Sequence, residues 1–186
     1  MTSVLKVDSI QTTSGSGFVI PPAGGIIQIQ YLQIDDATHT ISTTADTSVK
    51  VDELVVTITP TSTSSVIKLD AHVFGEFANA SDQANHMFFF YRNDTKLGFP
   101  QTGLTNNNCG ISMATRTYQT TDTDSTPEIA MYSFFDTPST TSAITYKVGI
   151  QTSNGGNYFL NRVVNTIDHD NYERGCSFIS ATEIAG

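Results

Sequence analysis

The amino-acid sequence predicts an all-β fold, a jelly-roll-like antiparallel β-sandwich with a short extended N-terminal arm. Short segments rich in β-branched and aromatic residues alternate between apolar and polar positions, which is the pattern of a strand with one buried face. Turn-forming residues separate these segments at intervals typical of sandwich folds. No segment carries an apolar repeat long enough to predict a helix.

The stretch of residues 54–77 shows this pattern most clearly. Apolar and polar residues alternate up to Ile58, turn-forming residues occupy positions 60–65, and alternation resumes from Val66. Proline has no amide hydrogen to donate to a neighbouring strand, so Pro60 marks the end of the first strand. We therefore predict strand, turn and strand, arranged as a hairpin or as a corner that joins two packed sheets.

Alternation of the same kind predicts about ten strands in all. Residues 26–34 change phase along the segment, which indicates a β-bulge or a strand buried on both faces. The Asn-Asp pair at 93–94 predicts a tight turn, and the run SNGGN at 153–157 predicts a second hairpin turn. The predicted strands are 26–34, 40–42, 49–59, 66–73, 86–92, 95–99, 111–118, 128–135, 143–152, 158–161 and 176–184.

Residues 1–23 differ from the rest and are predicted to form an attachment arm and linker, while residues 24–186 form the sandwich. A short apolar set near the N-terminus is followed by a polar Ser/Thr/Gly linker and by the turn-forming run PPAGG at 21–25. The arm is too short to bury its own apolar residues, so it must pack on the main domain, on a sister chain or on another protein.

Charge and composition exclude several classes of protein. The formal net charge is −9 and no cluster of Lys and Arg occurs, so we predict no binding to nucleic acid or to anionic membranes. No run of apolar residues is long enough to span a bilayer, so we predict no membrane insertion. The N-terminus has no secretory signal, so we expect synthesis in a cytoplasm and release by lysis or on a particle.

Few residues are candidates for ligand chemistry. Cys109 and Cys176 lack the spacing of a metal pair; a disulfide between them and two separate buried thiols both stay open. Residues 168–170 (DHD) could bind a cation, but adjacent side chains diverge, so a solvated loop is the better interpretation. Asp122 and Asp124 begin like a calcium loop but lack its glycine and closing glutamate. We predict no metal site and no cofactor.

The sequence gives no positive sign of catalysis. No G-x-S-x-G elbow is present, and the histidines stand far apart in the chain. The many serines and acidic residues make chance matches to a triad or a glycosidase carboxylate pair uninformative. We therefore expect no enzymatic activity, and keep a polysaccharide-cleaving enzyme as the third alternative.

Three motifs resemble segments of virion proteins from marine phages, especially cyanophages. They are LKVDSIQTTSG at 5–15, ITPTSTSSVIK at 58–68 and FDTPSTTSAITYKV at 135–148, and residues 161–162 and 183–184 fit the same pattern. The similarity spans nearly the whole chain, and the order and spacing of the motifs carry it. The resemblance implies an appendage protein of the tail-fibre or head-fibre kind, without catalytic residues to transfer.

The resemblance also implies an assembly and a location. We expect a trimeric tail-fibre or appendage component of the virion, made in the host cytoplasm, with other phage virion proteins and a host-surface glycan or protein as partners. The chain lacks the coiled-coil or β-helix repeats of a long fibre. A capsid decoration or cement protein that stabilises the shell, as in a head fibre, is therefore the alternative.

This interpretation assigns hypothetical roles to three groups of residues. The apolar set of the arm would attach the chain to the particle: Val4, Leu5, Val7 and Ile10. The aromatic run at 88–91 would form core on one face and a homotrimer interface on the other, through Phe88, Phe90 and Tyr91; a sugar-stacking platform is the alternative. The long polar loops 75–85, 101–109, 119–127 and 163–175 would contact a receptor, through Asn106, Asn107, Asp122, Asp168, His169 and Tyr172.

Overall fold

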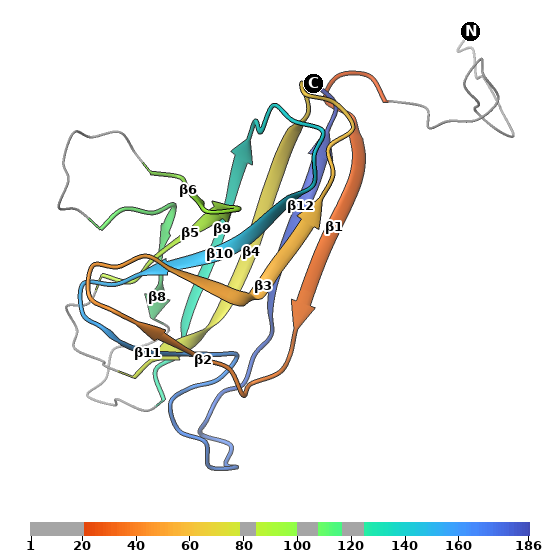
Figure 1. Ribbon diagram of the computed structural model, residues 1–186. Coiled ribbons are helices and arrows are strands. Elements are labelled where there is room, and N and C mark those ends of the chain that lie inside the picture. The colour runs from red at the N-terminus through yellow and green to blue at the C-terminus, as the bar shows by residue number, and fades with distance from the viewer. Residues whose placement is uncertain (1–20, 79–84, 100–107, 117–124) are drawn as a thin grey trace, which may run out of the picture.

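The computed structural model describes residues 21–78, 85–99, 108–116 and 125–186, which form twelve strands and no helix. Two antiparallel sheets pack face to face (Figure 1), which confirms the predicted all-β sandwich. The seven-stranded sheet contains β1 (Ile26–Ile34), β2 (Thr40–Thr43), β4 (Val66–Phe77), β8 (Thr115–Arg116), β9 (Glu128–Asp136), β11 (Gly156–Leu160) and β12 (Ser177–Ile184). The five-stranded sheet contains β3 (Val49–Ile58), β5 (Met87–Arg92), β6 (Thr95–Leu97), β7 (Ser112–Met113) and β10 (Ile144–Gln151).

The larger sheet is built around the longest strand, β4. Strand β12 pairs with one side of β4 along residues 66–72, and β11 continues on that side near Phe77. Strand β9 pairs with the other side, and β1 forms the outer edge beside β12. The side-by-side order β1, β12, β4, β9 therefore makes one broad face of the molecule.

The segment between β3 and β4 is a corner and not a hairpin. Strand β3 pairs with β10 in the five-stranded sheet, whereas β4 lies in the other sheet, so the alternative of a corner is confirmed. The predicted tight turn at 93–94 joins β5 to β6 as a true hairpin, with Asn93 in the left-handed region at φ 52°.

The predicted hairpin turn at 153–157 is wrong. It joins β10 to β11, which belong to different sheets and do not pair with each other. Asn and Gly favour a change of chain direction, but they do not decide whether the strands on either side of it bond to each other.

Several predicted boundaries also change. The bulge in β1 is confirmed, but it lies between Ile26 and Gln28, and exposed residues along β1 rule out a strand buried on both faces. Strand β4 continues to Phe77, into the predicted loop 75–85. The predicted strand 111–118 is two short strands, β7 and β8, that pair with different sheets.

The core lies between the two sheets and consists of their inward-facing side chains. Strand β4 contributes alternate residues from Ile67 to Val73. Phe90 of β5 packs on Tyr132 of β9, with ring centroids 4.7 Å apart, and the Tyr132 hydroxyl donates to the Phe89 carbonyl at 3.1 Å. Aromatic packing of this kind joins the two sheets across the sandwich.

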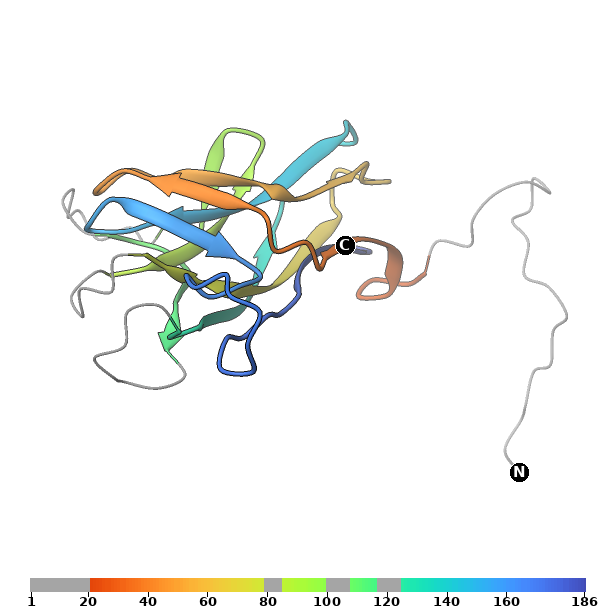
Figure 2. The same cartoon turned by 90° about the horizontal axis from the view of Figure 1, so that it is seen from below.

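The two ends of the sandwich differ in what they carry. One end, here called the base, comprises residues 21–25, 59–65, 137–143 and 185–186. The chain enters there beside its own C-terminus, since the Gly24 amide donates to the Ala185 carbonyl at 2.7 Å and the Ala185 amide to the Gly25 carbonyl at 2.9 Å. The opposite end, called the loop end, comprises residues 35–39, 85–86, 125–127 and 161–176. Figure 1 shows the ends on opposite sides of the strands, and Figure 2 views the sandwich from the side of the loop end.

The base is organised around Glu183, a buried carboxylate on β12. Its Oε1 accepts from the Thr61 amide at 2.6 Å, the Thr61 hydroxyl at 2.7 Å and the Ser65 hydroxyl at 2.7 Å. Its Oε2 accepts from Gln28 of β1 at 2.6 Å. Burial opposes ionisation, but these hydrogen bonds outweigh it and hold the pKa of Glu183 below its ordinary value. The Ser/Thr-rich corner is thus tied to β12.

Candidate functional site

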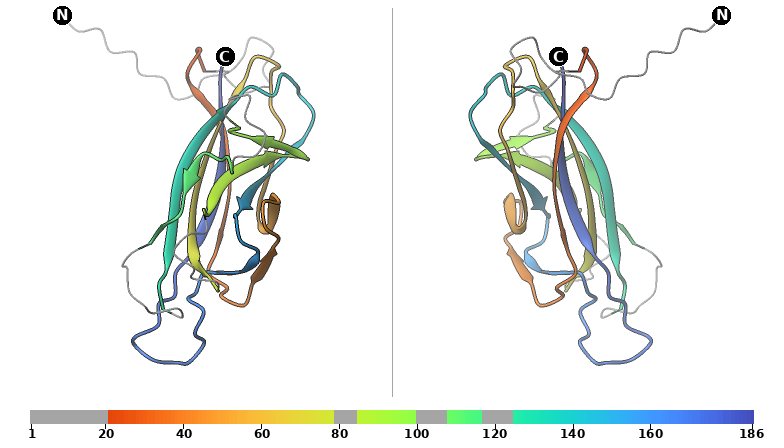
Figure 3. Two further views of the ribbon diagram at one scale, coloured as in Figure 1. Left: turned by 90° about the vertical axis from the view of Figure 1, so that its left-hand side faces the viewer. Right: turned by 90° about the vertical axis from the view of Figure 1, so that its right-hand side faces the viewer.

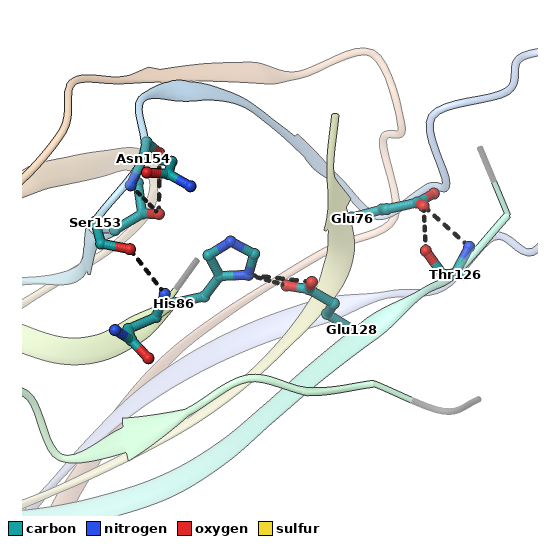
Figure 4. Close-up of polar contacts among 8 residues, drawn as sticks. Glu76, His86, Thr126, Glu128, Ser153 and Asn154 are labelled. Atoms are coloured by element: carbon teal, nitrogen blue, oxygen red, sulfur yellow. Dashed lines mark hydrogen bonds and ion pairs between the residues drawn. The ribbon is translucent and has the colours of Figure 1, made fainter. Parts of the chain in front are cut away.

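The loop end is positioned by Glu76, a buried residue near the end of β4 (Figure 4). Its Oε1 accepts from the amide of Thr126 at 2.9 Å and from the Thr126 hydroxyl at 2.6 Å. Its Oε2 accepts from the amide of Val164 at 2.7 Å. One carboxylate therefore holds both the segment before β9 and the start of the long loop after β11.

A second buried pair lies next to it, formed by His86 and Glu128. The Nδ1 atom of His86 lies 2.9 and 3.1 Å from the two carboxylate oxygens of Glu128 (Figure 4). The imidazole ring stacks on Phe77, with centroids 3.7 Å apart. This contact fixes the chain where it enters β5 against the start of β9. The side chains expose only 6% and 1% of their surface, so a substrate would have to displace their cover to reach them.

Asn161 organises the third part of the loop end, after β11. It is buried and has a left-handed backbone at φ 62°. Its amide nitrogen Nδ2 donates to the carbonyls of Ile34 and Asp36, each at 3.0 Å, and its Oδ1 accepts from the Ser177 hydroxyl at 2.6 Å. The ends of β1, β11 and β12 therefore meet on one side chain.

The loop that follows, residues 163–175, supplies the exposed surface of this end. Asp168 and His169 are exposed, and Tyr172 is half-buried with its ring 6.1 Å from that of His169. Ile167 is 62% exposed beside them. The structure thus brings three of the predicted contact residues together. The other three, Asn106, Asn107 and Asp122, lie outside the described residues, as do Val4, Leu5, Val7 and Ile10 of the arm.

The aromatic run of β5 does not have the predicted role. Phe88 and Phe90 are fully buried in the core, and Tyr91 exposes only 8% of its surface. Phe89 points to the other face but is also buried, with the Lys96 ammonium 3.9 Å from its ring centroid. A single chain leaves these rings no surface for a neighbouring subunit or a sugar, so the predicted interface and its alternative, the sugar-stacking platform, are corrected to intramolecular core.

The remaining candidates for ligand chemistry do not converge. Cys109 is buried and Cys176 is exposed, and the two are not bonded to each other, so only one matches the predicted buried thiol. Within the ranges that the structure describes, no three His, Cys, Asp or Glu side chains gather in a way that could hold a metal ion. The same ranges contain no helix long and apolar enough to cross a membrane.

Comparisons with known proteins give likeness to solved structures alone. No family model and no curated protein matches the chain. The chain is similar to the crystal structure of the infectious bursal disease virus VP2 subviral particle, at 12% sequence identity and a TM-score of 0.33. The match covers 91% of this chain and 46% of that chain, so this chain spans less than half of its length. A likeness at this level carries no functional argument.

The sequence alone did not predict the role of the residues that position the loop end. Glu128 shares the buried phase of β9 with Ala130 and Tyr132, so an acidic residue at an inward position was a readable signal. Glu76 gave no such signal, because it falls on the outward phase of β4 and is buried only by segments from elsewhere in the chain.

Proposed function

We propose that this chain is a structural protein of a phage particle, a homotrimeric tail-fibre or appendage component fixed by its N-terminal arm. The observation that carries the proposal is the opposition of the two ends. The chain enters the sandwich at the base, while the exposed loop 163–175 lies at the loop end. A chain anchored before residue 21 would therefore hold its loops on the side remote from the anchor. The three motifs that resemble phage virion proteins add to this.

The loop end suits binding to a host surface. Glu76, Glu128 and Asn161 hold the connections on a rigid scaffold, which lowers the entropy that binding must remove. The exposed side chains of Ile167 and His169 and the half-buried ring of Tyr172 combine apolar area with hydrogen-bonding groups. Such a mixture is suited to a glycan or a protein on the host surface. We propose a binding role and not a catalytic one, because the pair His86 and Glu128 is deeply buried.

Deletion of residues 1–20 tests the anchoring part of the proposal. The shortened protein should keep the circular dichroism spectrum and the assembly state of the full chain, because the twelve described strands all lie after residue 25. It should no longer co-purify with particles when it is supplied in place of the full chain. Normal incorporation of the shortened protein would contradict anchoring by the arm.

Substitutions in the loop test the binding part. Ile167→Glu and Tyr172→Ala should each lower the rate of particle adsorption to host cells, by about tenfold if one of them is an interface hot spot. Thr57→Glu adds the same charge as Ile167→Glu on an exposed position of β3, remote from the loop end, and should leave adsorption unchanged. Equal adsorption by all three would remove the host-contact role. Copy number per particle, measured by quantitative mass spectrometry, then separates an appendage from the more abundant decoration protein.

A further inference from the structure

The described residues leave the outer face of the seven-stranded sheet uncovered. It is formed by the outward side chains of β1, β12, β4 and β9, which lie side by side in that order. Figure 3 shows the two sheets from the side, and no described strand packs on this face. All of the outward positions come from strands, so the face is a broad and regular surface.

Two apolar strips lie along opposite sides of this face. The first strip is Ile29 and Tyr31 on β1, which are 53% and 76% exposed. The second strip is Met131 and Phe135 on β9, which are 69% and 59% exposed. These are four of the largest apolar side chains that the described residues leave in solvent, and they share one face. Three strand spacings separate the strips, a distance of about 14 Å.

The centre of the face is polar and electrically neutral. On β4, the Lys68 ammonium pairs with the Asp70 carboxylate at 2.8 Å, and Asp70 also accepts a hydrogen bond from Ser133. Strand β12 adds Ser180 beside Asp70 and Thr182 beside Lys68, and its Phe178 stacks on His72 farther along the same face. Lys68 and Asp70 cancel each other, and the other outward side chains of these four strands with an ionisable group are His72 on β4 and Tyr31 on β1.

This distribution of charge favours a second copy of the chain as the occupant. The whole chain carries a net charge of −9, so two copies repel each other wherever charged surfaces approach. A neutral face is the part of the surface where contact between copies meets the least repulsion. Tyr31 and Phe135 together leave roughly 250 Å² exposed, a substantial fraction of the roughly 800 Å² that each partner buries in a stable interface.

We propose that copies of this chain contact one another through this face, with the β1 strip of one copy packed against the β9 strip of the next. The strips differ from each other and lie on opposite sides of the face, so the contact is head-to-tail, the kind of contact that closes into a ring when the rotation between neighbouring copies allows it. In the homotrimer of the proposed function, each copy would use both strips, and the Lys68–Asp70 centre would face the axis. The inference rests on that assembly and names the surface that forms it.

Sedimentation analysis of the full chain and of charge variants tests the contact. The wild-type protein should sediment with the mass of a trimer of 20.1 kDa chains. Tyr31→Lys and Phe135→Glu should each lower the mass threefold, to a single chain. The double variant should regain the trimer mass, because the new ammonium of one copy meets the new carboxylate of the next. Ile167→Glu, an equally exposed apolar residue at the loop end, should stay trimeric.

Several results would overturn the inference. A trimeric Tyr31→Lys or Phe135→Glu protein means that copies meet elsewhere, and a double variant that stays monomeric rules out the pairing of the two strips. Circular dichroism checks that each variant is folded; Ile29→Lys with Met131→Glu serves as a second pair. A wild-type monomer overturns both this inference and the trimer of the proposed function, whereas failed particle incorporation affects only the proposed function.

Discussion

Replacing Glu183 with alanine tests whether the base depends on one buried carboxylate. The substitution removes the acceptor of four hydrogen bonds, from the Thr61 amide and hydroxyl, from Ser65 and from Gln28. Thr61 and Gln28 reach solvent and can bond to water instead, whereas the Ser65 hydroxyl is buried and cannot. A hydrogen bond to a charged group contributes about 1.5–3 kcal/mol, and a buried group left unpaired costs about 1–3 kcal/mol. The expected loss in the free energy of unfolding is therefore about 3–5 kcal/mol.

Urea unfolding at one fixed protein concentration measures this loss, because the proposed assembly would make stability depend on concentration. Glu53→Ala is the matched control, since Glu53 is only half-buried and its carboxylate lies 3.4 Å from His39. The control should change the free energy of unfolding by no more than about 0.5 kcal/mol. The reasoning is refuted if Glu183→Ala loses less than about 1 kcal/mol, or no more than the control.

Three further predictions concern single side chains. The folded pKa of Glu183 lies below its ordinary value of 4.5, so its contribution to stability is complete above that pH and is lost as the pH falls; Glu183→Gln should flatten the pH dependence of the urea midpoint in this range. Tyr158→Phe should leave stability unchanged or raise it by about 1 kcal/mol in a thermal melt, because the buried Tyr158 hydroxyl has no partner among the described residues. Gly149→Ala should destabilise by about 1–3 kcal/mol in urea, because its Cβ would lie 2.3 Å from a ring carbon of Phe89; an unchanged midpoint would show that the ring moves aside.

The strands were predictable from sequence because alternation is a local property. Strands β3, β4, β9 and β12 follow the two-residue period closely, and their predicted positions differ from the structure by a few residues at most. Which strand belongs to which sheet could not be predicted from the sequence in the same way. The connections 59–65 and 153–155 both read as turns, yet each crosses from one sheet to the other, and the partner of each strand comes from a distant part of the chain.

The roles of individual side chains were also predictable only in part. Phe88, Phe90 and Tyr91 were expected at a subunit interface, but their rings are buried within one chain. The sequence period shows which residues share a face and gives no measure of how completely one chain covers that face. The exposure of Tyr31 and Phe135 could not be predicted from the sequence either. An apolar residue on an alternating strand gives the same pattern whether its face is covered or in solvent. Whether the outward faces of β1 and β9 are covered or in solvent is decided by how the strands are arranged in space, which the sequence pattern does not show.

The meeting of residues 21–25 with residues 185–186 at the base has a practical consequence for the display of foreign peptides. Gly186 lies against Ser64, whose hydroxyl donates to the Gly186 carbonyl at 3.2 Å, so a reporter fused after it would emerge next to residues 21–25. Such a fusion would crowd the side proposed to face the particle. A peptide inserted near Ile167 would instead project from the loop end. A label or affinity tag placed there would leave the base uncovered.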